Sequence, residues 1–388
     1  MKKSKRLDLI PPYLFVKIEE KKDELVRKGI DVIDFGIGDP DLPTPPHIIN
    51  KMKEVLASKE AANYPTSKGE LPFRKAAADW YKKRFNVDLD PANEVCCLIG
   101  SKEGLAHLPL CFIDAGDISL VPDPSYPVFK ICTRLAGGEP YLLPLTAANK
   151  FIPELETIPA QVLKKAKLLF INYPNNPTGA VAGKDFFEKA VGFARKNNLL
   201  LVSDLAYSEM GYDGYRPSSV LEIPGAKDVT IEFHSLSKTY NMTGWRIGMA
   251  VGNREAVQAL ATIKSNIDSG AFKAIQLAAV EALSGPQDCV EKNNRVFEER
   301  RNVLYEGLAS LGWKFDKPKA TFYMWVPVPK GETSSSFTEK LLEKCGILAI
   351  PGNGYGPAGE GYVRFAITLP KERIAEAIER MKKQGIKY

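Results

Sequence analysis

Short apolar runs alternate with helical patterns along most of the chain, and a polar cluster follows each run directly. The runs are rich in Leu, Ile and Val at consecutive positions, which is typical of strands buried on both faces of a sheet. Three successive pairs of run and helical pattern occupy residues 94–100 with 101–113, 118–126 with 127–137, and 167–179 with 184–198. This order predicts an α/β fold in which helices sandwich a large, mainly parallel sheet.

The pattern changes near residue 286, where a long amphipathic helix precedes three strand-like segments and a closing helix. This second part reads as a smaller α+β domain. The first 45 residues contain one helix and the strand-like stretch DVIDFG, which is too little for an independent core. We therefore expect an N-terminal arm (1–45) that joins the small domain (286–388), with the large domain at 46–285.

Composition and charge exclude several classes of protein. Hydrophobic residues make up 44% and charged residues 26% of the chain, as in ordinary globular proteins. The net charge is +6, but basic and acidic residues are interspersed, so we expect no nucleic-acid partner. No apolar run approaches the roughly 18 residues of a membrane span, and the start does not read as a signal peptide. We expect a cytoplasmic protein without a membrane partner.

The metal-ligating residue types do not form a recognisable site. Six cysteines occur without CxxC spacing, mostly in apolar surroundings, which predicts buried, reduced thiols. The three histidines do not pair at ligand spacing, so no metal is expected.

Polar clusters at the ends of the runs are candidates for one shared crevice, because ligands bind beyond the carboxyl ends of parallel strands. A helix begins near Ser101, and its free N–H groups suit a phosphate, although an ordinary capping turn explains the stretch equally well. Asn176 lies on a predicted turn after an apolar run. Its amide either hydrogen-bonds a ligand oxygen or only stabilises the turn. Gly38 allows a ligand to approach the backbone, or marks a simple Gly-Pro turn.

Lys238 lies in the stretch HSLSKTYNMTGWRIG, directly after an apolar run. Partial burial disfavours the charged amine, and an uncharged lysine forms a Schiff base with a carbonyl group. The hydroxyls of Ser235 and Ser237, with Arg246, suit a phosphate. Asp204 directly follows another apolar run. It either caps the start of a helix or faces a cationic nitrogen of a ligand, and Tyr207 lies three residues further on. Together these residues predict a pyridoxal 5'-phosphate site, whereas a solvated surface lysine is the simpler alternative.

Five motifs in order carry a resemblance over essentially the whole chain: GIGDPDLPTP, NYPNNPTG, SDLAY, SLSKTYNMTGWRIG and YVRFAI. The chain resembles the fold-type I aminotransferases of class I/II, which depend on pyridoxal phosphate. Within them, the stretches IPPYLF, GSKEGLAHLPL and VPDPSYPVF are most similar to the LL-diaminopimelate aminotransferases. The resemblance implies an aspartate-aminotransferase-like fold with a mainly parallel, seven-stranded sheet.

The resemblance also implies roles for individual residues. Lys238 holds the cofactor and moves a proton, Asp204 pairs with the ring nitrogen, and Tyr207 is the third catalytic residue. Within the chain, the remaining cofactor contacts would come from Ser101, Lys102 (through its backbone), Tyr126, Asn176, Ser235, Ser237 and Arg246. Tyr64 would reach the phosphate bound by the neighbouring subunit, so the resemblance implies a homodimer with shared active sites. The substrate contacts would come from Gly38, Asn176 and Arg364. Apart from the resemblance, Tyr13 and Asn266 are candidates for contacts with the polar far end of the substrate, or else serve the fold alone.

The implied reaction transfers an amino group between an amino acid and a keto acid. We favour a reaction of lysine biosynthesis in which LL-diaminopimelate is the amino donor and 2-oxoglutarate is the acceptor. Aspartate, alanine or an aromatic amino acid as donor remains an alternative, as does a lyase reaction on the same cofactor. Arg364, which lies in an apolar strand, would clamp the substrate carboxylate, unless it only forms a structural ion pair.

Overall fold

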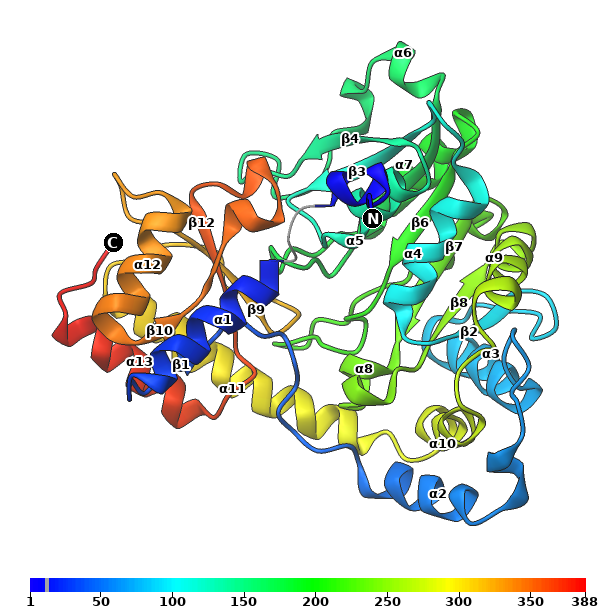
Figure 1. Ribbon diagram of the computed structural model, residues 1–388, viewed down its shortest axis with the longest axis horizontal. Coiled ribbons are helices and arrows are strands. Elements are labelled where there is room, and N and C mark those ends of the chain that lie inside the picture. Colours follow the sequence, from blue (N-terminus) through cyan, green and yellow to red (C-terminus); the bar gives the residue numbers. More distant parts are fainter. Residues whose placement is uncertain (11–13) are drawn as a thin grey trace.

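A seven-stranded sheet forms the centre of the larger part of the protein (Figure 1). The structure is a computed structural model that describes residues 1–10 and 14–388. The strand order is β2-β8-β7-β6-β5-β3-β4, and β8 alone of these seven runs antiparallel to its neighbours. The strands are β2 (Val95–Leu98), β3 (Ile118–Asp123), β4 (Glu139–Pro144), β5 (Ala166–Asn172), β6 (Leu200–Asp204), β7 (Thr230–Ser235) and β8 (Gly248–Gly252). The predicted mainly parallel, seven-stranded sheet is confirmed.

Helices cover both faces of this sheet, because its strands are apolar on both sides. One core contains side chains from α2 (Pro46–Leu56), α3 (Leu71–Phe85), α7 (Lys184–Lys196) and α10 (Lys273–Ser284). The core on the other face contains side chains from α4 (Ser101–Phe112), α5 (Val128–Leu135) and α9 (Arg254–Ile267). The short helices α6 (Ala160–Leu163) and α8 (Leu236–Thr239) complete this part.

Both ends of the chain build the smaller part, which has its own core (Figure 1). Strand β1 (Ile33–Asp34) pairs in parallel with β10 (Ile347–Leu348), so the N-terminal segment joins the C-terminal one as predicted. A second sheet has the antiparallel order β11-β12-β9. Its strands and the surrounding helices are β9 (Tyr323–Pro327), β11 (Ile350–Pro351), β12 (Tyr362–Ala366), α1 (Leu14–Arg27), α11 (Asp288–Ser310), α12 (Ser334–Cys345) and α13 (Lys371–Lys383). The domain boundaries proposed at residues 45 and 285 stay a prediction.

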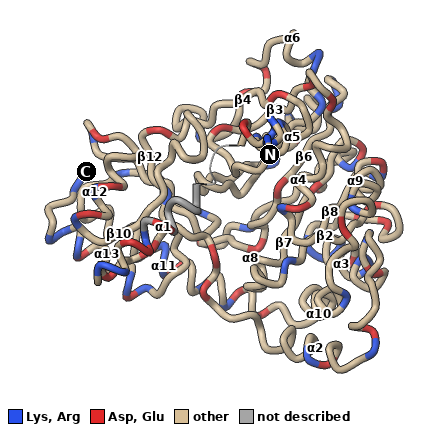
Figure 2. The backbone as a smooth tube through the Cα atoms, viewed as in Figure 1, with Lys and Arg blue, Asp and Glu red and all other residues tan. Residues whose placement is uncertain are grey.

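The surface charges are mixed, as the sequence indicates. Lysine and arginine alternate with aspartate and glutamate along the backbone (Figure 2). Among the described helices, no segment has both the length and the apolar character that crossing a bilayer requires. All six cysteines are free thiols; Cys111 and Cys289 are partly exposed and the other four are buried.

We predict that Phe170→Ala in β5 lowers the free energy of unfolding by about 3–5 kcal/mol, because it leaves a cavity in the core. Phe170 is fully buried, and its ring stacks on Phe129 with centroids 4.9 Å apart. Denaturant unfolding followed by fluorescence measures the change. As a control, Val26→Ala at a position 53% exposed should change stability by no more than about 0.5 kcal/mol. Equal effects of the two substitutions would contradict this account of the core.

Candidate active site

One cavity of about 450 Å³ lies at the carboxyl ends of the parallel strands and is lined on one side by residues of the smaller part of the protein. Strand direction explains its lining, since the loops after β2, β3, β5, β6 and β7 all emerge at the same edge of the sheet. Twelve of the residues predicted from the sequence line it: Gly38, Ser101, Lys102, Tyr126, Asn176, Asp204, Tyr207, Ser235, Ser237, Lys238, Arg246 and Arg364. The polar clusters that follow the apolar runs therefore converge on one crevice, as expected.

Lys238 lies on the single-turn helix α8, directly after β7. Its Nζ donates to the backbone oxygen of Gly38 at 2.7 Å. Burial lowers the pKa of Lys238 to about 8, although the nearby charge of Asp39 acts in the opposite direction. A minor fraction of this amine, on the order of a tenth at pH 7, is therefore uncharged and able to attack a carbonyl carbon, far more than for a solvated lysine.

Asp204 is the last residue of β6 and is 5% exposed. Burial raises the pKa of its carboxyl group to about 7, against the effect of a hydrogen bond from the Ala206 N–H. Its Oδ1 is buried and has no hydrogen-bond partner among the described residues. A cationic group stabilises a buried carboxylate that lacks hydrogen-bond partners, so Asp204 fits a ligand that carries a protonated ring nitrogen.

Arg364 approaches the cavity from β12 and is 1% exposed. Its Nη1 donates to Asn176 Oδ1 at 3.0 Å, and its Nη2 donates to the Gly36 backbone oxygen at 2.6 Å. The guanidinium also lies 4.2 Å from the centroid of the Tyr323 ring. These contacts fix the plane of the guanidinium, which suits bidentate binding of a carboxylate.

The start of α4 and Arg246 form the anion-binding end of the cavity. Gly100, with φ of 74°, precedes the helix, and a Cβ at this position would lie 2.4 Å from Arg246 Nη2. The missing side chain therefore lets the guanidinium reach the helix start. Ser235 caps α8 by accepting from the Ser237 N–H at 3.2 Å. A helix N-terminus beside an arginine and hydroxyl groups is suited to a phosphate.

Six residues that line the cavity were not identified from the sequence: Ile37, Asp39, Ala206, Thr243, Gly244 and Tyr323. The Tyr207 hydroxyl donates to the Tyr323 hydroxyl at 3.3 Å, and burial is the main reason that the pKa of Tyr207 lies well above its ordinary value. A Cβ at Gly38 would lie 2.0 Å from the Tyr323 hydroxyl oxygen, which explains the glycine. Tyr323 lies two positions from Trp325, the strand partner of Arg364, but only the structure supplies this register, so the sequence carries no local signal for it.

Three predicted residues do not line the cavity. Tyr64 is 88% exposed and lies outside it. Asn266 is exposed on α9, where its amide donates to the Thr262 backbone oxygen at 2.9 Å. Tyr13 lies outside the described residues.

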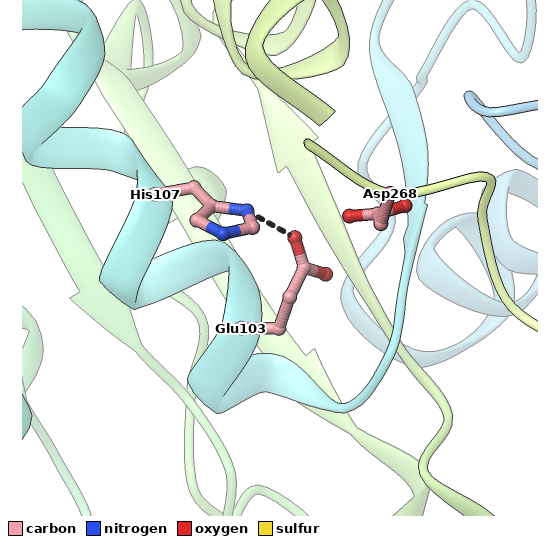
Figure 3. Close-up of side chains that lie close together, drawn as sticks. All are labelled: Glu103, His107 and Asp268. Carbon is pink, nitrogen blue, oxygen red and sulfur yellow. Dashed lines mark ion pairs between the residues drawn. The ribbon is translucent and has the colours of Figure 1, made fainter. Parts of the chain in front are cut away.

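A cluster of Glu103, His107 and Asp268 lies beside the start of α4 and offers ligand types that metals accept (Figure 3). The ammonium of Lys264 lies 2.9 Å from Glu103 Oε2 and 3.2 Å from Asp268 Oδ2. A lysine therefore supplies the positive charge that a metal ion would bring, and we assign no metal to this cluster.

Comparison with known proteins agrees with the geometry of the cavity. The model of the family "Aminotransferase class I and II" matches residues 30–381. An LL-diaminopimelate aminotransferase from Moorella thermoacetica is 57% identical, over 99% of this chain and 98% of the relative. The substrate-bound structure of BacF from Bacillus subtilis is 37% identical, with a TM-score of 0.95 over 99% of this chain and 98% of that one.

A Thermus thermophilus aspartate aminotransferase mutant is 29% identical, with a TM-score of 0.93 over 99% of this chain and all of that one. The fold is therefore aspartate-aminotransferase-like, as the resemblance implied. With a family match over most of its length and a relative sharing more than half of its residues, the chain belongs to the class I and II aminotransferases.

Proposed function

We propose that the cavity binds pyridoxal 5'-phosphate and transfers the amino group of LL-diaminopimelate to 2-oxoglutarate. One observation carries this proposal: Lys238 and Asp204 line the same cavity. The pKa of the Lys238 amine is lowered to about 8, and Asp204 Oδ1 is buried and has no hydrogen-bond partner among the described residues. The relatives above 50% identity that bear the name LL-diaminopimelate aminotransferase support the choice of donor.

The residues present fit this cofactor. Lys238 would hold its aldehyde carbon, and Asp204 would face its ring nitrogen, which satisfies the unpartnered oxygen. The phosphate would bind at the start of α4, with Ser101, Lys102, Ser235, Ser237 and Arg246. Tyr126, Asn176 and Tyr207 would contact the ring. When bound, the cofactor supplies an electron sink for the electron pair of the substrate Cα–H bond.

Lys238 moves the proton in this scheme. When it is not attached to the cofactor, the uncharged Nζ would act as a base and take the proton from the substrate Cα. Its position, 2.7 Å from the Gly38 carbonyl, keeps the amine beside the segment after β1, whose Gly36 carbonyl accepts from Arg364. Asp204 would be kept ionised by the cationic ring nitrogen opposite it, and would in turn keep that nitrogen protonated.

Arg364 and the Gly38 backbone would bind the α-carboxylate of either substrate. The guanidinium already lies against Asn176 and Gly36, so little side-chain freedom is lost on binding. Lysine and arginine at positions 102, 238, 246 and 364 give the cavity an excess of positive charge over Asp39 and Asp204. That excess suits anionic ligands: a phosphate and substrates with two carboxylates.

We further propose a cytoplasmic homodimer that acts in lysine biosynthesis. Tyr64, which is 88% exposed, would reach the phosphate of the neighbouring subunit, so each site would draw residues from two chains. Asn266 and Tyr13 would contact the far end of the substrate.

We predict that the protein loaded with pyridoxal phosphate forms glutamate from 2-oxoglutarate when LL-diaminopimelate is supplied. Its kcat/KM should exceed that for aspartate, alanine or phenylalanine by at least about 100-fold, since buried polar groups left unpaired penalise the wrong donor. A coupled glutamate assay measures the four donors under identical conditions. Equal or better use of another donor would overturn the choice of substrate, and keto-acid release without glutamate would indicate a lyase.

We predict that Lys238→Ala lowers kcat by at least about 10³-fold, because both the covalent anchor and the base are lost. The visible absorption band of the bound cofactor should disappear or shift in the same variant. Lys184→Ala, which removes an exposed lysine on α7, is the control and should match the parent protein. Turnover near the parent value in Lys238→Ala would contradict the proposal.

We predict that the rate at which cofactor-free protein captures pyridoxal phosphate rises with pH and levels off above about pH 8. The pKa of Lys238 is lowered to about 8, so the protonated, unreactive amine dominates below that pH and the neutral amine above it. Stopped-flow absorbance over pH 6–10 measures the midpoint, with controls for the titration of the cofactor itself. A midpoint near about 10.4, the value of a solvated lysine, would show that Lys238 does not react as described.

A further inference from the structure

A partly buried group of charges lies beside the first turns of α4, and its members do not line the cavity (Figure 3). Lys264 on α9 has no exposed surface, and its Nζ contacts carboxylate oxygens of both Glu103 and Asp268. Burying a lysine is costly unless it is paired, so this ammonium is held by specific partners. The cofactor and substrate contacts proposed for the cavity do not explain why Lys264 is buried between these carboxylates.

Glu103 occupies the third position of α4, one residue after Lys102. Its Oε2 accepts from the Ile99 N–H at 3.0 Å, which fixes how the chain enters the helix from β2. Its Oε1 lies 2.7 Å from His107 Nδ1, one turn further along the same helix. The carboxylate thus holds the helix start in place from the side away from the cavity.

The same carboxylate carries a negative charge within the first turn of the helix to which the phosphate is assigned. Burial acts to raise the pKa of Glu103, but the contact with His107 and the charge of Lys264 outweigh it, so the pKa lies below its ordinary value. Glu103 therefore stays ionised. A phosphate at this helix end would be repelled by it unless a cation offsets the charge.

We propose that Lys264 is a positioning residue for phosphate binding: its ammonium offsets the charge of Glu103 and thereby lets this carboxylate fix the start of α4 without repelling the phosphate. This inference rests on the proposed function, in which the cofactor phosphate binds at that helix start. Lys264 acts through Glu103 and does not line the cavity.

Formal charge in this group can be changed in steps with little change of shape. Two carboxylates against one ammonium leave a charge of −1 in the parent protein. Lys264→Met keeps the aliphatic stem and changes the net charge of the group to −2. Glu103→Gln keeps an acceptor for the Ile99 N–H and changes the net charge to 0. The double variant has a net charge of −1, as the parent has.

The dissociation constants of pyridoxal phosphate and of inorganic phosphate should follow this charge. We expect Lys264→Met to bind both at least about tenfold more weakly than the parent, Glu103→Gln to bind them at least as tightly, and the double variant to lie within about threefold of the parent. Equilibrium titration of the dimer or monomer as purified, with absorbance for the cofactor and calorimetry for phosphate, measures the values. Thermal unfolding of each cofactor-free variant is recorded in parallel.

A purely structural role for Lys264 predicts a different result. The unfolding temperature would fall while both dissociation constants stayed at the parent value, or the double variant would bind no better than Lys264→Met; either result would overturn the inference. Arg301→Met is the control, because it removes another buried cation, paired with Asp213 and far from α4, and should lower stability without changing phosphate affinity. Failure of the parent protein to bind pyridoxal phosphate would instead overturn the proposed function, and this inference with it.

Discussion

The parallel alignment of neighbouring strands in one sheet is the constraint on which the rest of the structure depends. Strands β2 to β7 run in the same direction, β2 because both it and β7 are antiparallel to β8, so the loops that follow them emerge at one edge. Residues as far apart in sequence as Ser101 and Lys238 therefore line one cavity. The helices on both faces make this arrangement possible, because they cover strands that are apolar on both sides.

The smaller part of the protein completes the site and changes its chemistry. Its strand β12 brings Arg364 to the cavity, and the N-terminal segment supplies the Gly38 carbonyl that accepts from Lys238. The enclosure that results moves two opposite groups toward their neutral forms: the pKa of Lys238 falls to about 8 and that of Asp204 rises to about 7, in both cases mainly through burial. A ligand with an aldehyde and a protonated ring nitrogen would bind both groups at once, which is the physical basis of the proposed cofactor site.

Much of this site follows from sequence because several of its residues lie in a strand or in the first residues after one. Asp204, Lys238 and Arg364 stand at such positions, and the period of the apolar runs predicts them. Tyr323 and Asp39 were missed because their side chains enter the cavity only through the packing of the two parts of the chain, which no local pattern records. The pairing of Lys264 with Glu103 was missed for the same reason, since it joins α9 to α4 across 161 residues. Tyr64 and Asn266 do not line the cavity of their own chain, and the role proposed for Tyr64 depends on a second subunit.

The most direct test of the central claim is to identify the residue to which the cofactor is attached. The protein loaded with pyridoxal phosphate would be reduced with borohydride, digested and analysed by peptide mass spectrometry. The account predicts that the phosphopyridoxyl group is found on Lys238 and that prior incubation with an amino donor removes most of it. Attachment to a different lysine, or modification spread over exposed lysines with Lys238 untouched, would contradict it.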